Sequence, residues 1–137
     1  TWNGGVWTGL RPDMAKRLPT RARLHQILRW IHHEFEPKKH IRLRVVQKMP
    51  RGFQDAEGAV WFDGPSPLIR IPARLTRSTA VYALLHEVAH CLLVERNPTG
   101  WKGGDHEGCE HGDKFYRILG TLERAFHDGG EGESMDF

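Results

Sequence analysis

Two histidines separated by three residues, with a glutamate directly after the first, are the residues of this chain most suited to chemistry. The segment His86-Glu87-Val88-Ala89-His90 places both imidazoles one turn apart if it is helical. Two imidazoles on one helical face can hold a divalent metal ion, and the adjacent carboxylate can take a proton from a water bound to that ion. The pattern therefore predicts a zinc site with Glu87 as general base.

The residues around this motif predict a buried helix. From Ser78 to Val94, His86, Glu87 and His90 are the only acidic or basic residues, and most of the others are apolar. A helix that is apolar almost all round belongs in the protein interior, where an uncompensated carboxylate is costly. A metal-bound water would compensate it. The alternative is that neighbouring backbone or side chains satisfy the two histidines and the glutamate.

A catalytic zinc site needs a third protein ligand and one open position. Downstream of the motif, four side chains could supply that ligand: His106, Glu110, His111 and Asp113. Cys109 could also reach the metal, although two cysteines in the whole chain are too few for a thiolate zinc site. The residues alone leave the third ligand open.

The segment Leu84-Leu85-His86-Glu87-Val88-Ala89-His90, followed by His111-Gly112-Asp113-Lys114-Phe115, resembles the zinc peptidases of the SprT-like and minimal-zincin group. In that group, His-Gly-x-x-Phe begins the last helix. A weaker likeness at Gly58-Ala59 and Ile69-Arg70-Ile71 extends the resemblance over residues 22–126. The resemblance implies Zn²⁺ held by His86, His90 and His111, with His106 and Glu110 as alternatives to His111.

The same resemblance implies a zinc metallopeptidase, in which Glu87 accepts the proton of the attacking water and passes it to the leaving amine. The oxyanion of the intermediate needs a further donor, for which Tyr82 and Tyr116 are candidates. Several acidic groups could orient a ligand imidazole by a hydrogen bond: Asp105, Glu110 and Asp113.

Hydrophobic periodicity predicts helices over 20–36, 78–94 and 113–127, and strands over 41–45, 59–62 and 68–71. Thr20 is expected to cap the first helix, and Thr76 or Ser78 the second. Pro72 suggests that the last strand is frayed or lies at a sheet edge. His32 and His33 are interpreted as surface histidines, and Cys91 as a small buried apolar residue.

The expected fold is α+β and minimal zincin-like. It comprises an N-terminal helix, a small, mostly antiparallel three-stranded sheet, the buried motif helix and a C-terminal helix. Residues 1–19 are expected to form a flexible arm, 20–127 the metallopeptidase domain, and 128–137 a disordered acidic tail.

Charge is distributed unevenly along the chain. Residues 1–51 hold twelve Lys or Arg against three acids, a balance of +9, whereas 52–137 hold eight against fourteen, a balance of −6. The basic half suggests nucleic acid as a partner, and the resemblance implies action on DNA-bound proteins. The alternative is a solvated basic surface. The basic residues concerned are Arg11, Lys16, Arg17, Arg21, Arg23, Arg29, Lys38, Lys39, Arg42 and Arg44.

No apolar run approaches the roughly 20 residues needed to span a bilayer. With two cysteines and no disulfide framework, the chain is expected to be cytoplasmic, without a membrane partner. A protein or peptide substrate would pair with the strand at 59–62 or 68–71. Three aromatic residues could line its side-chain pockets: Trp61, Phe62 and Trp101.

Two other functions remain open at this point. One is a noncatalytic nucleic-acid-binding module whose zinc is structural and closed by a fourth ligand such as Cys109. The other is a metal-dependent hydrolase of small amides.

Overall fold

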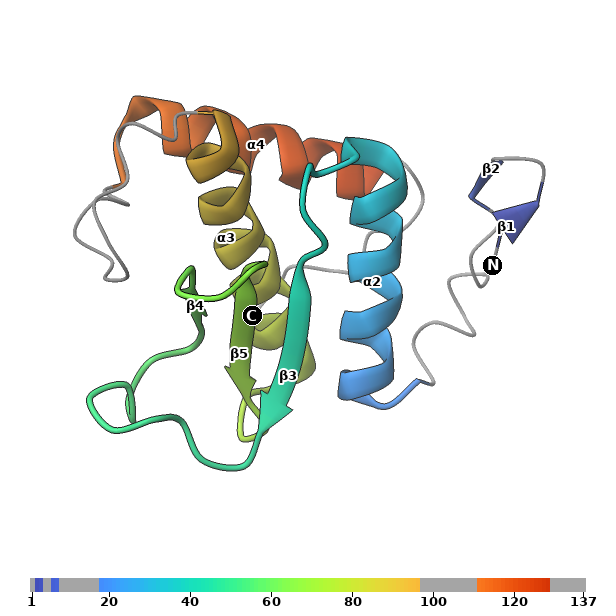
Figure 1. Cartoon of the computed structure of the whole chain (residues 1–137). Helices are drawn as coiled ribbons and strands as arrows, with labels where there is room; N and C mark the ends of the chain where they lie inside the picture. The colour runs from blue at the N-terminus through green and yellow to red at the C-terminus, as the bar shows by residue number, and fades with distance from the viewer. Residues whose placement is uncertain (1, 4–5, 8–17, 97–110, 129–137) are drawn as a thin grey trace.

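The computed structural model describes residues 2–3, 6–7, 18–96 and 111–128. Three helices, α2 (Thr20–Phe35), α3 (Arg77–Arg96) and α4 (Asp113–Asp128), accompany a three-stranded sheet of β3 (Arg42–Val46), β4 (Ala59–Trp61) and β5 (Leu68–Pro72). Two short strands, β1 (Trp2–Asn3) and β2 (Val6–Trp7), pair with each other. The α+β class and all three predicted helices of the described part are confirmed (Figure 1).

The sheet is mixed, which corrects the expectation of a mostly antiparallel one. Its order is β3-β5-β4, with β5 parallel to β3 and antiparallel to β4. The 62–67 loop joins β4 and β5 as a hairpin, whereas the longer 47–58 segment carries the chain past the position of β5. Helix-period and strand-period patterns carry no information on strand direction, so the parallel pair was not predictable from them.

β5 is the central strand, so the expectation that Pro72 marks an edge strand is wrong. Pro72 is the last residue of β5 and pairs with Val46, and the next donor to β3 is the Ala73 N–H, 2.8 Å from the Val46 carbonyl oxygen. A proline at the end of a strand does not remove a hydrogen bond from the interior of the strand ladder. Because β5 has neighbours on both sides, four of its five residues are buried.

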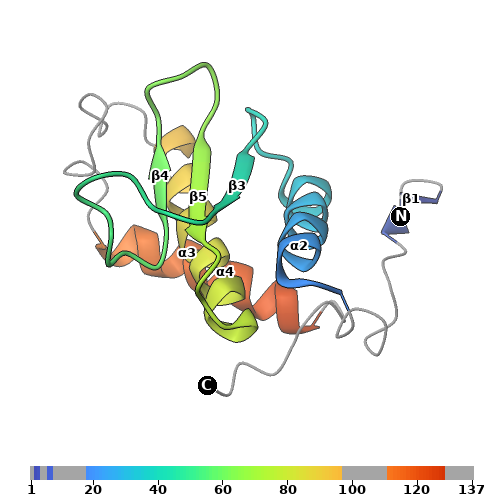
Figure 2. The same ribbon diagram turned by 90° about the horizontal axis from the view of Figure 1, so that it is seen from below.

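α3 packs on the sheet, α2 and α4 pack against α3, and the buried residues of these elements form one apolar core. Ile41 and Leu43 point to the helices from β3, while Arg44 is exposed, which confirms the predicted alternation. α4 runs across the ends of α2 and α3 (Figures 1 and 2). Near its C-terminal end the Phe126 ring lies 5.7 Å from the Trp30 ring of α2. α4 is therefore anchored on α2 at one end, which leaves its first turn over α3.

The two predicted helix starts differ in outcome. Thr76 caps α3, because the Thr79 N–H lies 3.4 Å from the Thr76 hydroxyl oxygen and the two hydroxyls are 2.9 Å apart. Thr20 does not cap α2: it is the first helical residue, and Pro19 occupies the cap position without a side-chain hydrogen bond. Proline is favoured near a helix start because its fixed φ suits the first turn.

α2 ends at Glu36, whose φ of 43° lies in the left-handed region. A Cβ atom makes this conformation costly, so Glu36→Gly should raise the free energy of unfolding by about 1 kcal/mol and Tm by about 3 °C. Thermal unfolding followed by circular dichroism measures the change. Glu36→Ala keeps the Cβ atom and is the matched control. An equal gain in both variants would contradict the conformational explanation.

Candidate metal centre

The three predicted histidines lie together in the structure. His86 and His90 are one turn apart on α3, and His111 directly precedes Gly112 and the first turn of α4. The His111 Nε2 atom is 3.2 Å from Nε2 of His86 and 3.1 Å from Nε2 of His90. One ring nitrogen from each histidine therefore converges on the same small volume.

These spacings fit a bound metal ion. With metal–nitrogen bonds of about 2.0–2.1 Å, two imidazole nitrogens on a tetrahedral zinc ion are separated by about 3.3–3.4 Å. A hydrogen-bonded arrangement fits less well, since one Nε2 can act either as donor or as acceptor and His111 faces two such atoms. The three residues can hold a metal ion, and the geometry does not identify which one.

Phe115 packs against all three imidazole rings. Its ring centroid lies 4.9 Å from that of His86, 4.5 Å from that of His90 and 4.6 Å from that of His111, on which it stacks at 25°. Phe115, in the first turn of α4, is fully buried. Two residues near it in the sequence are exposed: His111, which precedes the helix, and Tyr116. The Phe115 side chain thus couples the position of His111 to the two histidines of α3.

Burial favours the neutral form of His86. His90 is 5% exposed, and His86 is half-buried. Desolvation, and then the charge of His111, lower the pKa of His86 below its usual value. A neutral imidazole offers the lone pair that a metal ion needs, whereas a protonated one does not.

Glu87 is a buried carboxylate beside the three histidines. It is 6% exposed, and desolvation raises its pKa to about 7. Within the described parts of the chain, no side chain or backbone group donates a hydrogen bond to it. The alternative interpretation, in which neighbouring protein groups satisfy Glu87, gains no support from these residues. A buried, unpartnered carboxylate is typical of a functional position.

Gly58, which precedes the edge strand β4, leaves room for Glu87. A Cβ atom added at position 58 would lie 3.4 Å from the Glu87 Cγ atom and 3.6 Å from the Arg70 carbonyl oxygen. The start of β4 therefore lies directly against the carboxylate. Gly58 entered the sequence analysis only as part of a weak resemblance, and its proximity to Glu87 was not predicted.

Of the remaining candidate residues in the 101–113 segment, the structure describes only Asp113. His106, Cys109, Glu110, Asp105 and Trp101 lie outside the described residues. Asp113 is described and exposed, and it makes no hydrogen bond to a ligand imidazole. The role of Phe115 was missed, although its spacing of four residues from His111 places both on one helical face and could have indicated it.

Tyr82 and Tyr116 lie near the centre from α3 and α4. The exposed Tyr116 ring lies 6.2 Å from the His111 ring. Burial, followed by the charges of Glu123, Tyr116 and Glu57, raises the pKa of Tyr82.

Comparison with known proteins yields no relative. The chain matches no protein-family model, no curated protein sequence and no solved structure. Among the described residues, no helix is both long enough and apolar enough to cross a membrane. Assignment of a function therefore depends on the geometry of the site and on its two motifs.

If His111 is a ligand, His111→Ala should weaken binding of Zn²⁺ or Co²⁺ by at least about 100-fold. Loss of a residue that only hydrogen-bonds a metal ligand costs about 10–100-fold, so loss of a ligand should cost at least as much. Isothermal titration calorimetry on the metal-free protein measures this affinity. His127→Ala, which removes another exposed histidine of α4, should leave the affinity within a factor of about two. Equal affinities for both variants would exclude His111.

Proposed function

We propose that the protein is a zinc-dependent metallopeptidase of the SprT-like, minimal-zincin type. The observation that carries the proposal is the convergence of three imidazoles beside a buried carboxylate to which no described residue donates a hydrogen bond. Three histidine ligands leave one coordination position for water or substrate, which is the donor set of a catalytic zinc site. The resemblance in the two motifs supplies the peptidase assignment.

His86, His90 and His111 would hold the zinc ion. When bound, it would lower the pKa of a coordinated water and polarise a substrate carbonyl group. The Glu87 carboxylate holds the proton removed from the attacking water and delivers it to the leaving amine nitrogen. Its burial suits this role, since a pKa of about 7 allows both uptake and release near neutral pH.

The free edge of β4 is the place where a peptide substrate would pair. β5 is enclosed by β3 and β4, so of the two strands expected to bind substrate only β4 offers an edge in the described sheet. Gly58, directly before this edge, lies so near Glu87 that an added Cβ atom would be 3.4 Å from the Glu87 Cγ atom. An extended peptide that added to β4 would therefore carry its backbone past the proposed general base.

Glu87→Gln should abolish peptide hydrolysis while preserving zinc binding. The amide keeps the size of the carboxylate but cannot accept the proton, so kcat should fall by about 10²–10⁴-fold. Cleavage of a fluorogenic peptide library by the zinc-loaded protein provides the rate, and metal analysis provides the zinc content. Glu34→Gln, an exposed substitution on α2, is the matched control. A Glu87→Gln variant as active as the parent would refute the mechanism.

Tyr116 is the better placed candidate for the oxyanion donor. It is exposed beside His111, and among the described residues its hydroxyl has no hydrogen-bond partner, whereas Tyr82 already interacts with other groups. Tyr116→Phe should lower kcat by about 10–100-fold with a smaller effect on KM. Tyr82→Phe should change kcat less than threefold. The reverse order of effects would assign the role to Tyr82.

The alternative, a noncatalytic nucleic-acid-binding module with a structural zinc, predicts a closed fourth position. It would bind metal without hydrolysing any peptide in the same library. Action on DNA-associated proteins and a cytoplasmic location remain predictions from the resemblance and the composition.

A further inference from the structure

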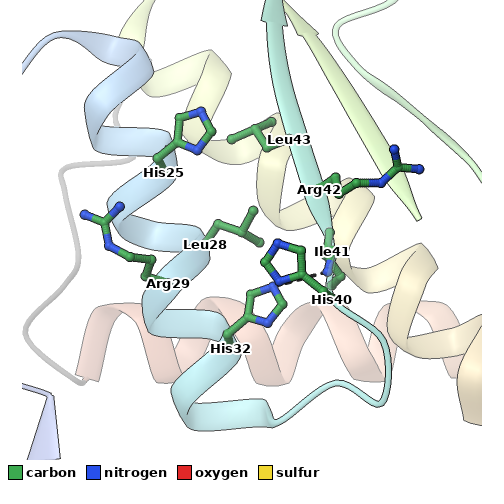
Figure 3. A pocket seen from close by; sticks show the side chains of 8 residues that line it. All are labelled: His25, Leu28, Arg29, His32, His40, Ile41, Arg42 and Leu43. Carbon is green, nitrogen blue, oxygen red and sulfur yellow. Dashed lines mark hydrogen bonds between the residues drawn. The ribbon is translucent and has the colours of Figure 1, made fainter. Parts of the chain in front are cut away.

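A cavity of about 430 Å³ lies between α2 and β3, at the edge of the sheet opposite to β4 and the histidine cluster. Three imidazoles line it: His25 and His32 from α2, and His40 from the segment before β3. Figure 3 shows their rings between the helix and the strand, whereas the Arg42 guanidinium extends on the other side of β3. The centre proposed above does not use this cavity.

The ionisable side chains that line this cavity are all arginines or histidines. Arg29 lies one turn after His25 on α2, and no Asp or Glu is among the lining residues. Leu28 and Leu43 are the aliphatic part of the wall. Three imidazoles and Arg29, with no carboxylate among the lining residues, form an environment that attracts an anion.

The imidazoles are available as hydrogen-bond donors. The Ile41 N–H donates to His32 Nε2 at 3.3 Å, so neutral His32 carries its proton on Nδ1. The rings of His32 and His40 lie 4.8 Å apart at 35°. A metal ion is a poor occupant, because His32 Nε2 is engaged and the described ligand atoms converge for a metal only at His86, His90 and His111.

We propose that this cavity binds a phosphate group, carried either by a small phosphate ester or by a nucleic-acid backbone. A phosphate offers several acceptor oxygens to the donors of His25, Arg29, His32 and His40. The aliphatic wall contacts the group to which the phosphate is attached. Arg42 contributes less, since one of its terminal nitrogens donates to the Ser66 carbonyl oxygen at 2.9 Å.

Binding should depend on pH. Burial, followed by the charges of Arg29 and Arg21, lowers the pKa of His25, and burial followed by the charge of His40 lowers that of His32. The described groups that act on the two imidazoles are therefore basic residues: Arg21 and Arg29 from α2 and His40 before β3, while the Arg42 guanidinium lies on the other side of β3. An anion favours the protonated imidazoles, so affinity is highest below their lowered pKa in the free protein and falls as pH rises through the raised pKa of the complex.

Nuclear magnetic resonance of the imidazole carbon-bound protons tests this proposal on the full chain. Sulfate serves as the first probe because its charge is constant between pH 6 and 8. Resonances of His25, His32 and His40 should shift and saturate, while those of His127 stay fixed. If binding raises one imidazole pKa by a unit, affinity should be about threefold to sixfold higher at pH 6 than at pH 8. Absence of saturable shifts in the three histidines would overturn the proposal.

Two arginine variants separate the cavity from general charge attraction. Arg29→Gln removes the arginine at the cavity and should weaken sulfate binding about tenfold. Arg44→Gln removes the same charge from an exposed position on β3 that does not line the cavity, and should weaken it less than twofold. Equal weakening by both would overturn the proposal in favour of nonspecific attraction.

Adenosine monophosphate and a single-stranded oligo(dT) of twelve nucleotides then distinguish the sources of the phosphate. Shifts of the three histidines with the mononucleotide, lost in Arg29→Gln, assign the site to a small phosphate ester. If the three histidines shift only with the oligonucleotide, and Arg29→Gln removes those shifts, the site binds a nucleic-acid backbone. Shifts confined to His86, His90 and His111 would place the anion at the other centre and overturn the proposal.

Discussion

The contact of Phe115 with three imidazole rings is the interaction on which the candidate centre depends. It joins the first turn of α4 to the middle of α3. Phe126 anchors the other end of α4 on Trp30 of α2. With both ends of α4 held, His111 is delivered to His86 and His90 by packing. Contacts of two phenylalanine rings at the two ends of α4 thus hold a polar centre in place at the N-terminal end of this helix.

Burial gives this centre its chemical character. α3 is enclosed by the sheet and by α4, so Glu87 is desolvated and its pKa rises, while His86 is kept neutral. Gly58 allows the start of β4 to approach the carboxylate, which brings a free strand edge to the same place. The basic cavity between α2 and β3 lies at the opposite sheet edge, so an anion bound there would not compete for the space beside Glu87.

The sequence predicted what depends on local pattern and failed where distant segments decide. Apolar spacing predicted α3, and the two histidine motifs predicted the ligand set that the structure brings together. Strand direction, the central place of β5 and the proximity of Gly58 to Glu87 depend on tertiary packing, which periodicity does not report. His32 was interpreted as a surface histidine, yet it is half-buried and accepts a hydrogen bond from the Ile41 N–H. That contact joins α2 to the segment before β3 and has no signature in either segment alone.

The central claim is that three imidazoles hold one metal ion and leave a position open. X-ray absorption at the zinc edge of the zinc-loaded protein tests it most directly. The account predicts three imidazole nitrogens at about 2.0 Å together with one oxygen ligand from solvent. A sulfur ligand at about 2.3 Å, or a fourth protein nitrogen in place of the oxygen, would show a closed structural site and contradict the account.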